Sequence, residues 1–384
     1  MTERNAAIDM LRGLTMVLMV FVNDFWTVLD VPHWLEHYAT WEDGMGLSDV
    51  IYPLFLFAVG MSVPYAIDRR YEKGLSTEST LGHIFSRTFA LVVMGTFICN
   101  QESREMTGCR WLWVLSMLVG FFLVWNQYKA GFKAAGWLRA AGVVLLTGLA
   151  VGYRTPEGAF FEGLWWGILG QIGWAYLFCA LAYLLCRKRP WPLPLIWLSL
   201  CLVNLSVVPM RGGGQLLGAN FPADLAGALH LGSGHIGIMA LGGVLTTLAE
   251  RRLKTARAGI GFAAAAVLAV LGMAAHQGWI VSKNLGTLPW CLYVSAIGVA
   301  LYTLLRILER KGWTGWFKPL QPAGMATLTV YMIPYLFVAG WVLLSPAIPD
   351  WLCGWVGVAK CALYTFVVLC LAWVITKLGI KLKV

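Results

Sequence analysis

The chain has 384 residues, of which 59% are hydrophobic and 12% are charged, and its mean hydropathy is +0.70. Soluble domains carry about a quarter charged residues, so this composition excludes a soluble globular protein and predicts an integral membrane protein. The net charge of +10 would indicate a nucleic-acid partner in a soluble protein. Here the basic residues gather in short loops between apolar segments, so we expect membrane lipid around the chain and no nucleic acid.

Apolar runs long enough to cross a bilayer recur along the whole chain. A helix needs about 20 apolar residues to span the hydrocarbon core, and lipid favours helices because their backbone polar groups are bonded internally. The alternating pattern of lipid-facing strands is absent. We therefore predict an all-α polytopic protein with about twelve transmembrane helices. Their expected positions are residues 8–30, 48–68, 81–100, 110–127, 136–152, 164–186, 191–209, 232–250, 257–275, 288–309, 323–345 and 354–377.

The distribution of positive charge between alternate loops predicts the topology. With the N-terminus in the cytoplasm, 22 of the 29 Lys and Arg residues fall on the cytoplasmic side. The positive-inside rule therefore predicts an N-in, C-in protein with an even number of helices. No linker divides residues 1–384, so we expect one transmembrane domain. The layout predicts a bacterial inner-membrane location, with the first apolar run retained as a helix because it lacks a small-residue cleavage site.

Nine cysteines are present, and most lie inside apolar runs. None stands in a CxxC or Cys/His metal-binding spacing, so we expect no metal site. Cys99, Cys109 and Cys353 are expected near one face of the membrane, where the sequence leaves a disulfide open.

Polar residues crowd the junction of the first two apolar runs, between Met16 and Gly60. Asn23 lies near the end of the first run, and Asp49 opens the second. The loop between them adds His33, His37, Trp41, Glu42 and Asp43. Charges and amides at the edge of a bilayer core are costly unless they face a cavity or serve a function. A histidine beside carboxylates is a candidate general acid or base, which makes this outer loop the candidate catalytic centre.

Each of these residues also has a structural interpretation. His37 can be an interfacial loop histidine without chemistry, and Asn23 can be a packing amide between helices. Asp49, with Ser48, can cap the N-terminus of the second helix. Trp41 can be an interface anchor rather than a platform for a sugar ring.

Two further outward loops, 209–231 and 276–287, are long enough to help bind a water-soluble ligand. The first ends at His230, with His235 a few residues later, and the second holds Lys283. Candidate ligand-binding residues on this side are therefore Trp41, Glu42, Asp43, His33, His230 and His235.

Several motifs resemble one known family. Residues 8–23 read IDMLRGLTMVLMVFVN, and residues 47–60 read LSDVIYPLFLFAVG, with a histidine, a tryptophan and a glycine between them. Weaker matches follow at 167–178 and 322–335. In this order they resemble the membrane-embedded acyltransferases typified by heparan-α-glucosaminide N-acetyltransferase and its bacterial relatives.

The resemblance implies transfer of acetyl from cytosolic acetyl-CoA to an amino sugar on the far side of the membrane. It implies that His37 is the active-site histidine, with Asn23 and Asp49 as its companions. Asn23 would hydrogen-bond the thioester carbonyl, and Asp49 would orient the imidazole. Candidate acetyl-CoA contacts are Arg12, Arg69, Arg87, Gln171 and Tyr331. Among them, Arg87 lies within a predicted span and needs an anionic partner.

The sequence leaves several alternatives open. His33 competes with His37 as the base, and direct transfer competes with an acetyl-histidine relay. The acceptor is a sugar or glycan that receives acetyl on nitrogen or oxygen, and a homodimer is not excluded. Outside the acetyltransferases, a secondary sugar transporter and a subunit of a polysaccharide assembly system are the rivals.

Overall fold

The computed structural model describes residues 5–216, 227, 229–253, 258–345 and 347–384, and over these residues the fold is all-α. The longer helices are α1 (Ala6–Val22), α2 (Leu47–Glu72), α3 (Thr77–Ser103), α4 (Arg110–Trp125), α5 (Ala135–Gly152), α6 (Ile168–Cys186), α7 (Pro192–Val207), α9 (His235–Leu253), α10 (Ala258–His276), α11 (Leu288–Arg310), α14 (Pro334–Leu344) and α15 (Gly354–Lys377). Shorter pieces are the 3₁₀ helices η1 (Phe25–Thr27), η2 (His33–Leu35) and η3 (Gly315–Leu320), and the helices α12 (Gln321–Met325) and α13 (Thr327–Met332).

The structure has the helices of an integral membrane protein. Within the described residues, nine helical segments are long and apolar enough to span a bilayer. The other three predicted spans also coincide with helices. Of these, α4 and α7 are shorter apolar helices, and α9 carries Glu250, Arg251 and Arg252 at its C-terminal end. The count of twelve and the N-in, C-in orientation stay predictions.

One predicted span, 323–345, is not a continuous helix. The backbone leaves helical geometry at Ala326, with φ −128° and ψ 42°, which separates α12 from α13. Pro334 then begins α14 at a position where its missing N–H costs no helical hydrogen bond. The hydropathy of this run therefore predicted an apolar helical segment but not its division.

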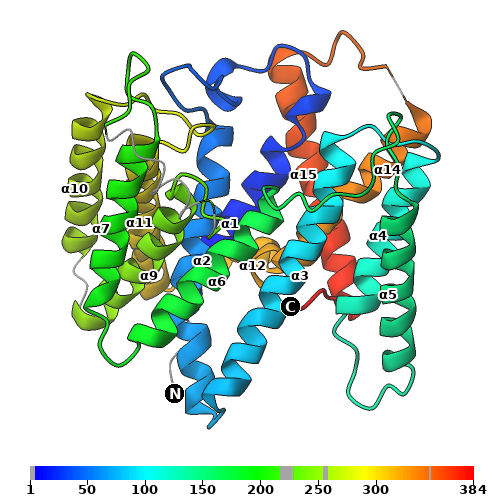
Figure 1. Cartoon of the computed structure of the whole chain (residues 1–384), viewed down its shortest axis with the longest axis horizontal. Coiled ribbons are helices and arrows are strands. Elements are labelled where there is room, and N and C mark those ends of the chain that lie inside the picture. Colours follow the sequence, from blue (N-terminus) through cyan, green and yellow to red (C-terminus); the bar gives the residue numbers. More distant parts are fainter. Residues whose placement is uncertain (1–4, 217–226, 228, 254–257, 346) are drawn as a thin grey trace.

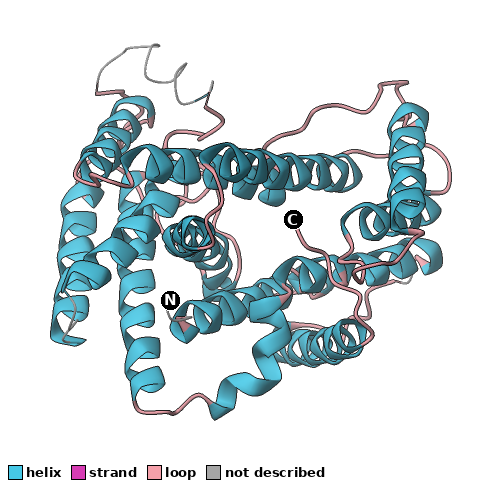
Figure 2. Ribbon diagram, turned by 90° about the horizontal axis from the view of Figure 1, so that it is seen from below, coloured by secondary structure: helices cyan, strands magenta, loops and turns pink. Residues whose placement is uncertain are grey.

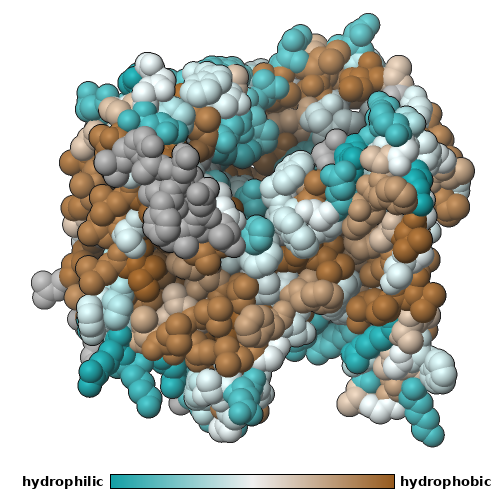
Figure 3. Space-filling model, in the orientation of Figure 1, coloured by the Kyte–Doolittle hydropathy of each residue, from teal (hydrophilic) through white to brown (hydrophobic). Residues whose placement is uncertain are grey.

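The helices form a broad assembly with two flanks (Figure 1). Helices α7, α9, α10 and α11 lie on one flank, α4, α5 and α14 lie on the other, and α1, α2, α3, α6, α12 and α15 lie between them. On the face shown in Figure 3, apolar residues dominate the middle, and hydrophilic ones gather at the top and bottom. The C-terminal end of the chain reaches into the middle of the assembly (Figure 2). There the backbone N–H of Leu382 donates to Thr329 Oγ1 at 2.9 Å.

Among the nine apolar helical segments in the described part of the chain, α2 is the most buried, with 72% of its most apolar 18-residue stretch inside the protein. It approaches α9 closely at two glycines. A Cβ built on Gly60 would lie 1.8 Å from the backbone oxygen of Ala240, and one on Gly243 would lie 2.0 Å from that of Phe57. Only glycine permits this contact, which fixes the height and rotation of α2 and thus the position of Asp49 at its outer end.

The loop that joins α1 to α2 lies at the end of the assembly opposite the N-terminus (Figure 1). The turn between α2 and α3 lies at the N-terminal end of the assembly (Figure 1). All nine cysteines are free, so the disulfide that the sequence left open among Cys99, Cys109 and Cys353 is not formed.

Candidate active site

The structure brings His37 and Asp49 into direct contact. His37 Nδ1 lies 2.7 Å from Asp49 Oδ1. The Asp49 side chain is 2% exposed, whereas that of His37 is 52% exposed. The carboxylate is therefore buried behind an imidazole that presents its other edge to the outside, as in the base-orienter pairs of hydrolases and transferases.

Backbone donors hold the Asp49 carboxylate in place. Its Oδ2 accepts from the N–H of Tyr38 and from the N–H of Gly46, each at 3.1 Å. The Gly46 bond is the helix cap that the structural interpretation expected. Ser48 does not cap the helix, because its hydroxyl donates to the Leu35 carbonyl at 2.6 Å. Asp49 thus caps α2 and contacts His37 at once, so the two interpretations are compatible.

Lys283, from the loop between α10 and α11, completes this cluster. Its Nζ lies 3.0 Å from His37 Nδ1 and 3.6 Å from Asp49 Oδ1. The sequence placed Lys283 in an outward loop but offered no reason to select it, because 246 residues separate it from His37. Nothing short of a tertiary contact could have identified it.

The other charged residues of the first loop brace it. His33 Nε2 lies 2.6 Å from Glu42 Oε1, and the His33 ring stacks on that of Tyr38 at 4.3 Å between centroids. The N–H of Ala39 and the His33 contact lower the pKa of Glu42 below its ordinary value. Trp41 is 67% exposed. His33 thus already has a carboxylate partner on the surface of the loop, while His37 has a buried one.

Asp43 ties the first loop to the rest of the outer surface. Its Oδ1 lies 2.7 Å from His276 Nε2 and accepts from the N–H of Val281 at 2.8 Å, and Arg211 donates to its Oδ2. Partial burial opposes ionisation, but these three partners outweigh it and lower the pKa of Asp43. The structure therefore gives Asp43 a bracing contact across three loops.

The remaining predicted outer residues are not brought to His37 by any hydrogen bond among the described residues. Asn23 ends α1 with its backbone N–H donating to Met19 O at 3.0 Å, and its side chain is exposed. His230 lies 4.2 Å from the Trp174 ring. His235 Nδ1 lies 3.0 Å from Ser233 Oγ. Asp24, beside Asn23, is the buried residue, and Lys360 donates to it at 2.7 Å.

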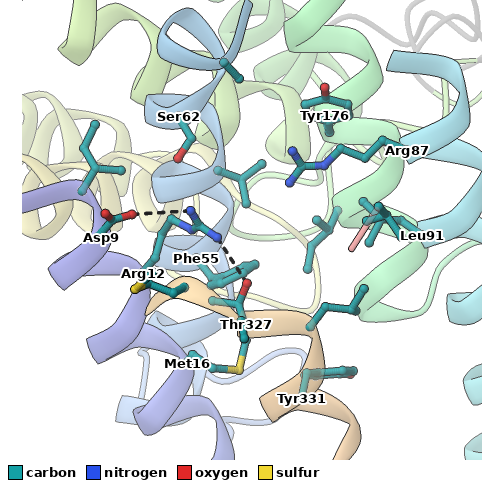
Figure 4. Close-up of a pocket in the computed structure, with 18 of the residues that line it drawn as sticks. Asp9, Arg12, Met16, Phe55, Ser62, Arg87, Leu91, Tyr176, Thr327 and Tyr331 are labelled. Atoms are coloured by element: carbon teal, nitrogen blue, oxygen red, sulfur yellow. Dashed lines mark hydrogen bonds and ion pairs between the residues drawn. The ribbon is translucent and has the colours of Figure 1, made fainter. Parts of the chain in front are cut away.

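A cavity of about 440 Å³ lies on the N-terminal side of the assembly, within the ~300–1,000 Å³ typical of small-molecule sites. Its walls come from α1, α2, α3, α6, the α12–α13 region and the C-terminal residues (Figure 4). Four of the five predicted acetyl-CoA contacts line it, namely Arg12, Arg69, Arg87 and Tyr331. The structure therefore collects into one space residues that the sequence separates by more than 300 positions.

The cations of this cavity differ in how they are held. Arg12 donates to Thr327 Oγ1 at 3.2 Å and lies 3.8 Å from Asp9 (Figure 4). Arg87 lies over the Tyr176 ring, 4.5 Å from its centroid. The Arg87 Nε is buried without a hydrogen-bond partner among the described residues. A buried, unpaired guanidinium donor is costly, and an anionic ligand would satisfy it.

Gln171, the fifth predicted contact, is not among the residues that line the cavity. It accepts a hydrogen bond from the Tyr52 hydroxyl, and its own Nε2 donates to Trp166 O at 2.6 Å. Tyr52 is one helical turn from Asp49 on α2, and the cavity residue Phe55 is one turn further. Asp49 therefore stands about 9 Å along the helix from the cavity wall.

Comparison with known proteins gives a family for this region. Residues 4–103 match the model of heparan-alpha-glucosaminide N-acetyltransferase, catalytic. The mouse (Mus musculus) protein of that name is 33% identical over 100 residues, and the human (Homo sapiens) protein is 32% identical over 99 residues. Each match covers 26% of this chain and 14% of the relative. Residues 4–103 are related to this acetyltransferase family. The matched region contains His37, Asp49, Arg12, Arg69 and Arg87, so it includes the outer pair and three cavity cations.

Proposed function

We propose that this chain is a transmembrane acetyltransferase that takes acetyl from acetyl-CoA on its N-terminal side and passes it to an amino sugar on the other side. One observation carries the proposal: a single buried helix, α2, bears Arg69 in the cavity and Asp49 at the outer site. Twenty residues separate the two, or about 30 Å along the helix, which matches the ~30 Å hydrocarbon core.

The cavity supports acetyl-CoA as the donor. Coenzyme A carries phosphates that cannot enter lipid, and Arg12, Arg69 and Arg87 would hold them. The deeper wall is apolar and aromatic, with Phe55, Leu91 and Tyr331, which suits the pantetheine arm. The positive-inside distribution supports the cytosol as the side of entry.

The outer pair supports the chemistry of acetyl transfer. The acceptor amine attacks the thioester carbon while His37 Nε2 removes its proton; the carbon–sulfur bond breaks, and the released thiolate of coenzyme A takes up a proton. A positioned histidine base contributes about 10²–10⁴-fold. Asp49 would keep the Nδ1 proton in place, leaving Nε2 as the free lone pair. Asn23, at the end of α1, remains our candidate donor to the thioester carbonyl.

The acceptor would bind on the outer surface beside His37. Trp41 is exposed there and offers an aromatic face for a sugar ring. Glu42, Asp43 and His33 brace the loop that carries it, so their contribution to acceptor binding would be indirect. The bacterial inner membrane as location, and one domain over residues 1–384, stay predictions.

The test is acetyl transfer by the purified protein in lipid nanodiscs, with radiolabelled acetyl-CoA and either glucosamine or glucose. We expect labelled N-acetylglucosamine and no product from glucose. His37→Ala should abolish transfer while acetyl-CoA binding is retained, and His33→Ala should leave most activity. Product from glucose would establish an O-acetyltransferase. Sugar uptake without acetyl-CoA would establish a transporter, and absence of any coenzyme A affinity would favour an assembly subunit.

A further inference from the structure

Lys283 lies against the ring of His37. Its Nζ is 3.0 Å from Nδ1 and 3.5 Å from Nε2 of that ring. The same ammonium lies 3.6 Å from Asp49 Oδ1. The two charged neighbours of His37 therefore have opposite sign, and their effects on its protonation oppose each other.

The position of the ring proton follows from the shorter of the two contacts. Nδ1 and Asp49 Oδ1 are 2.7 Å apart, a distance that two lone pairs tolerate only with a proton between them. That proton belongs to Nδ1, because a carboxylate has no donor. Nδ1 is then unable to accept from Lys283, so the ammonium pairs with the Asp49 carboxylate.

Lys283 is held at this place by its loop. The hydroxyl of Ser282 donates to the Thr40 carbonyl at 2.8 Å, and the N–H of Ser282 donates to Thr287 Oγ1 at 3.1 Å. Asn284 Nδ2 donates to the Tyr38 carbonyl at 3.3 Å. Neighbours on both sides of Lys283 are thus bonded to the loop that carries His37. Burial lowers the pKa of Lys283, although Asp49 opposes that shift.

The loop that carries His37 has further ionisable groups of its own. They include Glu36, Tyr38 and the mutually bonded pair of His33 and Glu42. α2 contributes Asp49, and the loop between α10 and α11 contributes Lys283. Among the described residues, Asp49 and Lys283 are the two charged side chains within hydrogen-bonding distance of the His37 ring.

We propose that Lys283 is a positioning residue that keeps His37 neutral, by cancelling the attraction that the Asp49 carboxylate exerts on a second ring proton. An aspartate alone would favour the imidazolium, which has no free lone pair and is useless as a base. The buried Asp49 carboxylate orients the ring. The Lys283 ammonium offsets the stabilisation that this carboxylate would give to the imidazolium. This role rests on the proposed function, in which His37 is the base, but the protonation state itself is measurable without catalysis.

The experiment measures how fast diethylpyrocarbonate modifies His37 as a function of pH, since only the unprotonated imidazole reacts. The intact protein in nanodiscs is labelled between pH 5 and 8, and peptide mass spectrometry reports each histidine separately. In Lys283→Met, the pH at which His37 is modified at half its maximal rate should rise by about one unit, because removal of a nearby cation favours the imidazolium. Lys283→Arg should leave it close to the parent value, and His33 serves as the internal control.

The result that would overturn the proposal is an unchanged or lowered His37 midpoint in Lys283→Met. If Lys283 is merely structural, both variants will change labelling of His33 and His37 at all pH values and lower the unfolding temperature. In Lys283→Met, the midpoint of the acidic limb in the pH profile of kcat/KM should move to higher pH by the same interval. If the labelling midpoint rises but the parent protein transfers no acetyl, the proposed function fails while the role of Lys283 stands.

Discussion

In the outer site, formed by His37, Asp49 and Lys283, the buried Asp49 carboxylate contacts both of the other side chains. Asp49 faces three kinds of partner: backbone N–H groups, an imidazole and an ammonium. A neutral amide of the same shape would satisfy some of them but would lose the charge that fixes the ring tautomer.

We expect Asp49→Asn to lower kcat by about 100-fold at neutral pH. The amide can donate to Nδ1, which favours the tautomer that carries its proton on Nε2, and Nε2 then cannot act as the base. The measurement is initial-rate kinetics with saturating acetyl-CoA. Glu42→Gln is the matched control: Glu42 is bonded to the neighbouring His33, so it should retain most activity. A kcat for Asp49→Asn within threefold of the parent would contradict the assignment.

Asp43 gives a prediction about stability and pH. Its pKa is lowered in the folded protein, so it stabilises the fold when ionised, at pH values above its unfolded pKa of about 3.9. This contribution is lost as the pH falls through the lower folded value. We therefore expect the unfolding temperature of the parent to fall further than that of Asp43→Asn between pH 5 and pH 3. Parallel curves for the two proteins would refute this role.

At the scale of residues, the sequence identified which groups are chemically suited to the site but not how they are paired. His33 and His37 look alike in the sequence, and only the fold gives one a surface carboxylate and the other a buried one. Gln171 stays a predicted acetyl-CoA contact; in the structure it accepts a hydrogen bond from Tyr52 and does not line the cavity. Side-chain partners of this kind depend on helix rotation, which hydropathy does not encode.

At the scale of elements, α2 connects the two sites, and its packing on α9 sets its position. Apolar length alone predicted α2, α3, α11 and α15 closely, because a span must match the bilayer thickness. The division of 323–345 was missed, since Ala326 carries no sequence signal for its non-helical backbone. Pro334 was the available signal for the second break.

The contact between α2 and α9 gives a test by substitution. Gly60→Ala should destabilise the protein by about 1–3 kcal/mol, because the added Cβ meets backbone that has no room to move. Gly82→Ala is the matched control on α3, where an added Cβ would meet no atom within 4 Å. Thermal unfolding in nanodiscs compares the two. Equal midpoints would show that α2 and α9 are not in close contact.

At the scale of the whole molecule, Arg69 in the cavity wall and Asp49 at the histidine site lie near the two ends of α2. Arg87→Gln should raise the KM for acetyl-CoA by about tenfold while changing kcat little, because the lost bond is made equally in the ground state and the transition state. Arg104→Gln is the control, since Arg104 forms an ion pair with Glu162 at 3.0 Å and neither residue lines the cavity. Steady-state kinetics with varied acetyl-CoA measures the KM of each variant. An unchanged KM for Arg87→Gln would show that Arg87 does not bind acetyl-CoA.

The account as a whole claims that donor and acceptor meet from opposite compartments. The decisive measurement uses sealed proteoliposomes of defined orientation, verified by protease access to an N-terminal tag, with labelled acetyl-CoA on one side and glucosamine on the other. We predict product when acetyl-CoA is on the side of the N-terminus and glucosamine on the opposite side. Product formed only when both substrates share one compartment would contradict the claim.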